Sequence, residues 1–251
     1  MKYLVTIFVF LNVLSTAISQ IVDTININKI DNQGRKQGLW KKYEDTTLKY
    51  VGYFKDDKPI GTFNYYYPDK KIKSISVYSN NGSVARVTMF HLNGKKSAEG
   101  VYRDEKKDSI WNYYNENEEL ISVESYANGL KNGISKIYYP GSNVLAEEIN
   151  WKYGNKDGKW TQYFTTGNVK LIANYKNGKL NGKVTLYYLS GKVKYYGEYI
   201  DSKKQGTWVY MKENGSIIKK EIYNNGYLTK IEYYDKEAEK KDNELKETLQ
   251  K

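Results

Sequence analysis

Strand-like runs rich in aromatic residues alternate with polar turns along most of the chain, and the pattern recurs about every 24 residues. Aligned on the segment that begins at Gly158, equivalent segments start at intervals of 23 to 25 residues. The eight starts are Gly38, Gly61, Ala85, Ser109, Gly133, Gly158, Gly182 and Gly206. A fixed period of this length indicates a repeat architecture, in which each unit packs on its neighbours.

Large side chains occupy fixed positions in these repeats, counted from each start as position 0. Position +5 is aromatic in seven of the eight repeats, with Met211 in the last. A second column near +17 is aromatic in all eight, once a one-residue deletion and a one-residue insertion are allowed for. Position +2 holds four of the five tryptophans, which are Trp40, Trp111, Trp160 and Trp208. These columns predict rings that stack between neighbouring repeats.

Each repeat predicts one β-hairpin. Residues +1 to +6 are rich in Trp, Tyr, Val and Thr, and a polar break such as residues 165–168 separates them from a second run of the same kind. The repeats are joined by further turns such as residues 177–182, where Gly and Asn tolerate the positive φ of a tight reversal. A turn centred near +8 and +9 places +2 opposite +15, where several repeats carry Gly, Ala or Ser. We expect the large ring to lie over this small residue.

The expected fold is all-β, an elongated single-layer antiparallel sheet of about eight tandem β-hairpin repeats with a short C-terminal helix. The repeat array spans residues 34–234 and follows a lead-in over residues 20–33. The charged tail over residues 235–251 lacks Gly, Pro and aromatic residues and spaces Ala238, Leu245 and Leu249 along one helical face. This spacing predicts a helix that covers the last strand, with a frayed tail as the alternative.

The first nineteen residues have the order of segments that is typical of a cleaved signal peptide. Met1 and Lys2 form a short positive region, residues 3–13 are apolar, and Ala17 and Ser19 are the small residues before a cut at Gln20. A signal peptide over residues 1–19 predicts a secreted or periplasmic protein. An apolar first strand is the alternative for this segment.

Composition argues against catalysis. The chain has no Cys and a single His, His91, so it has no thiolate nucleophile and no His-rich metal site, and in the sequence no partner residues for a Ser–His pair converge on His91. The adjacent acidic pairs at 56–57, 118–119 and 147–148 fall in turns or on opposite faces of a strand. We therefore expect no enzyme, no cofactor and no metal site.

The net charge of +11 favours anionic partners in general. The lysines are spread through turns and strand faces, without a Lys/Arg block or a nucleic-acid-binding motif. We therefore expect no nucleic acid partner, and an anionic membrane surface or a glycan stays open.

The repeats resemble a known family. Residues 50–54, Tyr-Val-Gly-Tyr-Phe, lead to Gly61 and resemble the Y-x-G-x-W…G core of MORN repeats. The first strand carries Trp, Phe or Val at +2 in seven of eight repeats, where MORN repeats usually have Gly. That form, roughly G-x-W-x-x-Y-Y-x-x-G, is similar to the MORN-variant repeat of YwqK-type antitoxin proteins. The resemblance covers about residues 34–234 and implies a non-enzymatic scaffold that binds a protein, with an antitoxin-like or immunity-like role.

Two kinds of binding protein fit these observations. The first is a scaffold that binds a protein partner through one face of the sheet, and the second is a cell-envelope module for glycan, choline-type or phospholipid ligands, suggested by the repeated Trp and Tyr. Positions +2 and +4 share one face. The candidate binding residues there are Trp40, Tyr65, Trp111, Tyr113, Trp160, Trp208 and Tyr210. Rings that only bridge the strands of a thin sheet would produce the same columns.

Overall fold

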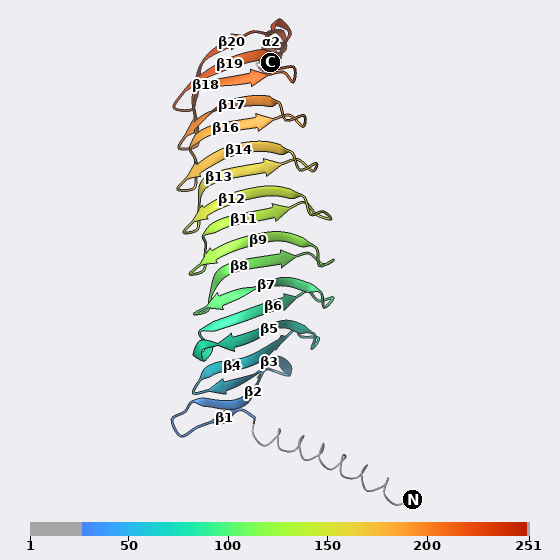
Figure 1. Ribbon diagram of the computed structural model, residues 1–251, viewed down its shortest axis with the longest axis vertical. Coiled ribbons are helices and arrows are strands. Elements are labelled where there is room, and N and C mark those ends of the chain that lie inside the picture. The colour runs from blue at the N-terminus through green and yellow to red at the C-terminus, as the bar shows by residue number, and fades with distance from the viewer. Residues whose placement is uncertain (1–26, 250–251) are drawn as a thin grey trace, which may run out of the picture. The chain divides into compact units, whose positions relative to one another are not determined.

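The computed structural model describes residues 27–249, which form two compact units. The first unit holds the described residues up to Lys106 together with Glu116–Glu118, and the second holds Lys107–Asn115 and the described residues from Glu119 onward. The predicted signal peptide and the first part of the lead-in lie outside the described residues. Within each unit the strands lie side by side in chain order (Figure 1).

The first unit is an antiparallel meander of seven strands. They are β1 (Lys29–Ile30), β2 (Lys36–Glu44), β3 (Thr47–Lys55), β4 (Lys58–Tyr66), β5 (Ile72–Ser79), β6 (Val84–Phe90) and β7 (Lys96–Arg103). Each strand pairs with the next one in the chain. A short 3₁₀ turn, η1 (Asn80–Gly82), joins β5 to β6.

The second unit continues the same pattern with thirteen strands and helix α2 (Lys236–Leu249). Its strands are β8 (Lys106–Tyr114), β9 (Leu120–Ala127), β10 (Leu130–Lys131), β11 (Gly133–Tyr138), β12 (Leu145–Lys152), β13 (Asn155–Tyr163), β14 (Val169–Lys176), β15 (Lys179–Leu180), β16 (Gly182–Tyr187), β17 (Val193–Ile200), β18 (Lys203–Met211), β19 (Ile217–Asn224) and β20 (Tyr227–Tyr233). All the described pairings are antiparallel.

Eight hairpins require sixteen strands, and all sixteen are present among the described residues. Four further strands, β1, β10, β15 and β20, arise because the array is flanked by pairing segments at both ends and because two joins pair back onto the preceding strand. The predicted all-β, single-layer antiparallel hairpin fold is confirmed.

The predicted register is also confirmed. Position +2 pairs with +15 in all eight repeats, as Trp160 does with Ala173. The same register sets each +17 aromatic opposite position 0, as Tyr175 is opposite Gly158. A ring at +2 therefore faces a small residue in three hairpins, as Trp40 faces Gly52, and a glutamate in two, as Trp208 faces Glu221.

Every hairpin carries a β-bulge between positions +4 and +5. The turn that follows has Gly at +9 in four repeats, with φ from 83 to 90°. These four residues are Gly94, Gly167, Gly191 and Gly215. A bulge increases the local twist of the strands, so the same position of each repeat contributes to the bending of its sheet.

One face of each sheet is more buried than the other. We name the side that carries positions 0, +2, +4, +13, +15 and +17 the aromatic face, because successive strand residues point to opposite sides. Among the described residues, the buried side chains on this face are Phe63, Ser76, Ala85, Val87, Ala98, Trp111, Ser135, Ile149, Ala173, Val184, Trp208 and Glu221. The core of this single-layer fold therefore lies on the aromatic face.

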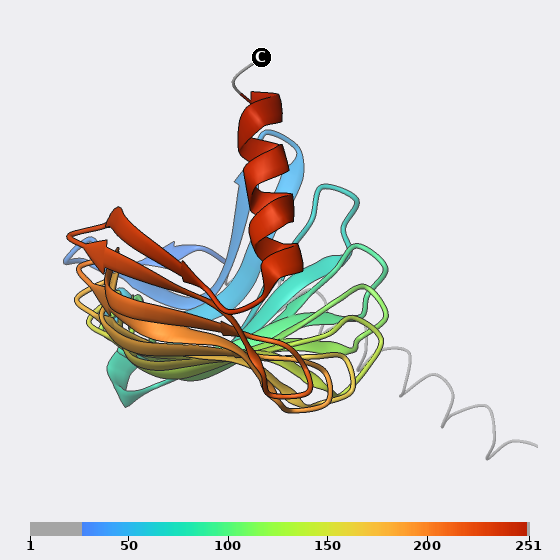
Figure 2. The ribbon, with the colours of Figure 1, turned by 90° about the horizontal axis from the view of Figure 1, so that it is seen from above.

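The predicted C-terminal helix is confirmed as α2. Asp235 forms an ion pair with Lys212 and caps the helix, since its carboxylate accepts the backbone N–H of Glu237 at 3.0 Å. Asp242 of α2 accepts hydrogen bonds from Lys219 at 2.7 Å and Tyr233 at 2.9 Å, both on the aromatic face. Figure 2 shows the strands of this unit curved into a trough with α2 rising from its inner side, so the aromatic face is the inner face. No helix among the described residues is long and apolar enough to cross a membrane.

Candidate functional site

The aromatic rings connect neighbouring repeats in edge-to-face contacts. The indole of Trp208 lies between Tyr199 of the preceding repeat, at a centroid distance of 5.0 Å, and Tyr223 of its own repeat, at 6.3 Å. Phe63 lies in the same way between Phe54 and Tyr78, at 5.1 and 5.0 Å. Phe63 and Trp208 thus each contact two +17 rings in the edge-to-face geometry that aromatic pairs favour.

Glycine at +15 allows this packing, although not within its own hairpin as the sequence suggested. A Cβ atom at Gly197 would lie 2.3 Å from the ring of Trp208, and one at Gly52 would lie 2.3 Å from Phe63. Both rings belong to the following repeat. The strand pairing shifts by one residue at each of these glycines, and the ring of the next strand packs directly on the glycine backbone, which it helps to bury.

Lysines at position −2 lie over the rings in five of the eight repeats. These are Lys36, Lys107, Lys131, Lys156 and Lys204. In every case the ammonium lies 4.6 to 5.2 Å from the centroid of the +17 ring of the same repeat. Distances this short are typical of cation–π contacts. Five of the chain's own lysines therefore occupy cation sites on the aromatic face.

Two of these lysines lie near a carboxylate at +15. Glu221, which is 8% exposed, accepts hydrogen bonds from Tyr210 at 2.6 Å and Tyr223 at 2.9 Å and forms an ion pair with Lys219 at 3.1 Å. The Nζ of Lys204 is 3.7 Å from the same carboxylate. In the fourth repeat, Glu124 accepts hydrogen bonds from Tyr126 and from Lys131 at 2.7 Å.

These contacts raise the pKa values of the tyrosine hydroxyls and lower the pKa of the Glu221 carboxyl. Burial, and then the bond to Glu221, raises the pKa of Tyr223 to about 12 and that of Tyr210 further. Burial acts to raise the pKa of Glu221, but the hydroxyls of Tyr210 and Tyr223 and the ammonium of Lys219 outweigh it, so the pKa lies below its usual value. The network therefore favours neutral tyrosines around an ionised glutamate.

The Glu221→Gln variant should be less stable than the parent at neutral pH by about 1–3 kcal/mol, because hydrogen bonds to a charged acceptor are replaced by neutral ones. The folded pKa of Glu221 is lowered from 4.5, so its contribution is complete above that pH and is lost as the pH falls through the folded pKa. The difference in the free energy of unfolding between the parent and the variant should therefore become smaller below about pH 4.5. Urea unfolding across this pH range measures it.

Glu198→Gln is the matched control, since Glu198 is exposed on the opposite face of β17, which is separated from β19 by β18. It should change the free energy of unfolding by no more than about 0.5 kcal/mol at any pH. A stability difference for Glu221→Gln that stays constant from neutral to acidic pH would contradict the assignment of an ionised Glu221.

The seven predicted binding residues all lie on the aromatic face, but they differ in exposure. Trp111 and Trp208 are 0% and 2% exposed, so their observed role is packing and they offer no ring surface to a ligand. Five are partly buried, namely Trp40, Tyr65, Tyr113, Trp160 and Tyr210. A lysine ammonium lies over four of these five rings, and the exception is Tyr65.

The acidic pairs 147–148 and 56–57 lie where the sequence predicted, the first with its two side chains on opposite faces of a strand and the second in a turn. Glu147 accepts a hydrogen bond from Gln162 at 2.7 Å on the aromatic face, while its neighbour Glu148 points to the other side. Asp56 and Asp57 lie in the turn after β3, where Asp57 accepts the backbone N–H of Lys36 at 2.8 Å. In the part of the chain that the structure describes, no group of three or more His, Asp or Glu residues is placed to hold a metal ion.

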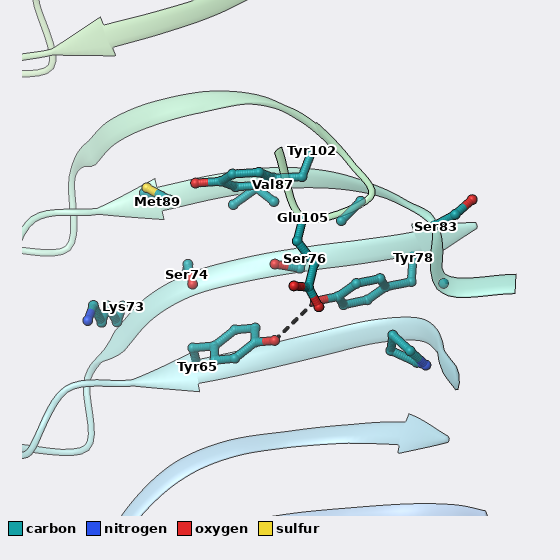
Figure 3. A pocket seen from close by; sticks show the side chains of 13 residues that line it. Tyr65, Lys73, Ser74, Ser76, Tyr78, Ser83, Val87, Met89, Tyr102 and Glu105 are labelled. Atoms are coloured by element: carbon teal, nitrogen blue, oxygen red, sulfur yellow. Dashed lines mark hydrogen bonds between the residues drawn. The ribbon is translucent and has the colours of Figure 1, made fainter. Parts of the chain in front are cut away.

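Position −2 lacks lysine in three repeats, where Pro59, Ser83 and Leu180 stand instead. Leu180 fills the space with its own side chain, since it packs on the cluster of Val184 and Trp208. Between Pro59 and Ser83 the space stays open as a cavity of about 550 Å³ (Figure 3). It is lined by Pro59, Tyr65, Lys73, Ser74, Ser76, Tyr78, Gly82, Ser83, Ala85, Val87, Met89, Tyr102 and Glu105.

The sequence analysis did not identify this cavity, which lies entirely within the first unit. The signal was available in the aligned repeats, because lysine at −2 is lost in two successive repeats. The loss of these lysines indicates a cavity only if the lysine side chain is known to lie over the aromatic face, and that direction comes from the structure.

Comparison with known families supports this division into repeats. Three segments match the MORN repeat variant. They cover residues 59–80, 156–177 and 180–201, and each MORN-variant segment begins at position −2 of its repeat. Comparison with curated proteins gives no significant match. The chain is therefore a repeat protein with MORN-variant segments in both units.

Proposed function

We propose that the chain is a non-catalytic, exported scaffold that binds a protein partner through its aromatic face. The MORN-variant segments support a scaffold role, because repeat arrays present extended surfaces built from nearest-neighbour contacts. The order of segments in residues 1–19 supports export.

The observation that carries the proposal is that the four tryptophans at +2 of the aromatic face are buried or covered by a lysine, so they offer no free ring face to a small ligand. A sugar or a quaternary ammonium needs an accessible ring face. Two of the +2 tryptophans are buried, and lysine ammonium groups lie over Trp40 and Trp160 at 5.0 and 5.6 Å. Five lysines that would attract lipid phosphates are held against rings in the same way. These contacts favour a protein partner over the glycan and phospholipid alternatives.

The resemblance of the first strand to YwqK-type repeats supports a finer assignment. A protein of this type would neutralise its partner by binding it, as an antitoxin or immunity protein does. Export of the chain places that partner outside the cytoplasm.

The proposal is tested with residues 20–251 as bait in an envelope or secreted fraction, followed by titration of each captured protein in purified form. We expect one protein to bind saturably with a Kd of about 1 μM or lower, which corresponds to about −8 kcal/mol. Anionic vesicles and cell-wall glycan are titrated in parallel. Strong binding to vesicles or glycan without any purified protein that binds would overturn the proposal.

A further inference from the structure

Three repeats share a pair of tyrosines at +4 and +17, and in two of them a lysine ammonium binds to the hydroxyls. In the last repeat, Lys204 donates to Tyr210 at 3.1 Å and to Tyr223 at 3.2 Å. In the fourth repeat, Lys107 donates to Tyr113 at 2.6 Å, and its ammonium lies 5.2 Å from the ring of Tyr126. The hydroxyl pair and the ring faces together form an ammonium site.

The second repeat has the same tyrosine pair without the lysine. Tyr65 and Tyr78 bond to each other at 3.1 Å, and position −2 is Pro59, which carries no charge. Phe63 takes the place of tryptophan at +2, and it stacks on Tyr65 at 6.3 Å as Trp111 stacks on Tyr113 at 6.2 Å. The cavity of about 550 Å³ occupies the side where the lysine would lie.

A carboxylate accompanies the ammonium site in all three repeats. The fourth and eighth repeats supply it from +15, as Glu124 and Glu221. The second repeat has the buried Ser76 at +15, and Glu105 lines the cavity from the turn after β7. Figure 3 shows the Glu105 side chain pointing into the cavity, on the side of the tyrosine pair. The site thus keeps an acidic group while the lysine at position −2 is missing, and the lysine that lines the cavity, Lys73, has its ammonium 5.9 Å from the ring of Tyr67.

The backbone at Glu105 is unusual for such a side chain. Its φ is 63°, in the left-handed region that a long side chain rarely adopts. The equivalent position in four later joins is glycine, namely Gly129, Gly154, Gly178 and Gly226. Glycine is the ordinary residue for this conformation, whereas Asp57 and Ser202 stand at the equivalent position of two other joins. Glu105 therefore places a carboxylate over the cavity at a position where four joins have no side chain.

We propose that this cavity binds the side chain of a lysine from the partner polypeptide, in the place that Lys107 and Lys204 occupy in their own repeats. The lysine stem packs on Val87 and Met89, and the ammonium donates to the hydroxyls of Tyr65 and Tyr78 close to Glu105. The inference rests on the proposed function only in that the lysine belongs to a protein. Choline cannot donate these hydrogen bonds, and a neutral sugar cannot balance the carboxylate.

The first test titrates residues 20–251 with a short glycine peptide that has one central lysine and blocked ends, so that the lysine carries the only charge. We expect saturable binding, with shifts in the NMR signals of Tyr65 and Tyr78. The same peptide with an Nε-acetylated lysine and free choline should each bind at least about tenfold more weakly, since both lack the ammonium donors. Equal binding of the lysine and acetyl-lysine peptides would overturn the inference.

The second test fills the cavity with a lysine side chain of the protein itself. Pro59→Lys supplies the missing intrachain lysine and should weaken binding of the lysine peptide by at least about tenfold. Pro59→Gln adds a side chain without a charge at the same cavity-lining position and should weaken binding less than Pro59→Lys does. Glu105→Gln should weaken binding by about tenfold, and Arg86→Gln, on the opposite face of β6, should not change it. Each variant is compared with the parent by circular dichroism and unfolding midpoint.

If Pro59→Lys fails to fold, Glu105→Gln alone decides, because Glu105 is exposed and its replacement disturbs no packing. Unchanged peptide binding by Glu105→Gln or by folded Pro59→Lys would overturn the inference. A captured protein that binds Pro59→Lys as tightly as the parent would also overturn it, although the scaffold proposal would stand. Selective lysine-peptide binding would support the cavity assignment even if the capture experiment failed and overturned the scaffold proposal.

Discussion

Replacing Trp208 with alanine should lower the free energy of unfolding by about 3–5 kcal/mol. The indole is 2% exposed and contacts the rings of Tyr199 and Tyr223, and the ammonium of Lys204 lies 4.4 Å from its centroid. Alanine removes all of these contacts. A single-layer sheet has no second layer that could move in to fill the gap. Relaxation of the structure around the cavity should therefore recover little of the lost stability.

Urea unfolding followed by circular dichroism measures this effect, since the signal does not depend on the tryptophan that is removed. Trp208→Phe is the matched control, because it keeps a ring in place. The buried indole N–H of Trp208 has no hydrogen-bond acceptor, so phenylalanine loses no hydrogen bond and should cost only about 1–2 kcal/mol. An alanine variant as stable as the phenylalanine variant would contradict the packing role of this position.

Gly197→Ala is expected to lower the free energy of unfolding by about 1–3 kcal/mol. The added Cβ would lie 2.3 Å from the Trp208 ring, a distance at which either the ring or the strand must move. The ring is held by neighbours on both sides, and a strand shift would disturb the pairing of β17 with β18. The same unfolding measurement applies, at one fixed protein concentration.

Two further variants show whether the loss comes from this contact. Glu198→Ala lies one residue away on the exposed, opposite face and should stay within about 0.5 kcal/mol of the parent. In the double variant Gly197→Ala/Trp208→Phe the smaller ring leaves room for the methyl group, so the combined loss should be smaller than the sum of the two single losses. Additive losses would show that the glycine acts through its backbone alone.

The sequence predicted the hairpins and their register because both depend on local chemistry. A period of two along each strand and a polar turn at a fixed place leave one pairing that keeps all the rings on one side. The pairing of Trp160 with Ala173 could therefore be derived from a column of large residues and a column of small ones. The four extra strands could not, because they form where turns and termini happen to come within pairing distance of the sheet.

The burial of the candidate residues was not predictable in the same way. An alignment of repeats shows that Trp111 and Trp40 share a face, but it does not show that curvature and neighbouring rings bury the first and leave the second partly exposed. The sequence placed the lysines in turns and on strand faces and did not single out those at −2. Their ammonium groups lie over rings because the strand twist directs that side chain across the inner face, a three-dimensional effect that spacing alone does not encode.

The residue at position −2 determines, under the proposed binding mode, how many ammonium-binding sites the repeat array offers. The ammonium of Lys204 lies over the aromatic face while its backbone takes part in the strand pairing. The proposed binding mode therefore implies that exchanging this one side chain opens or fills an ammonium site and leaves the rings, the strands and their register in place. A tandem array can therefore gain one such ammonium-binding site with each duplicated repeat that lacks lysine at −2. The number of uncapped repeats, rather than the length of the chain, then sets how many side chains of another molecule it can hold at once.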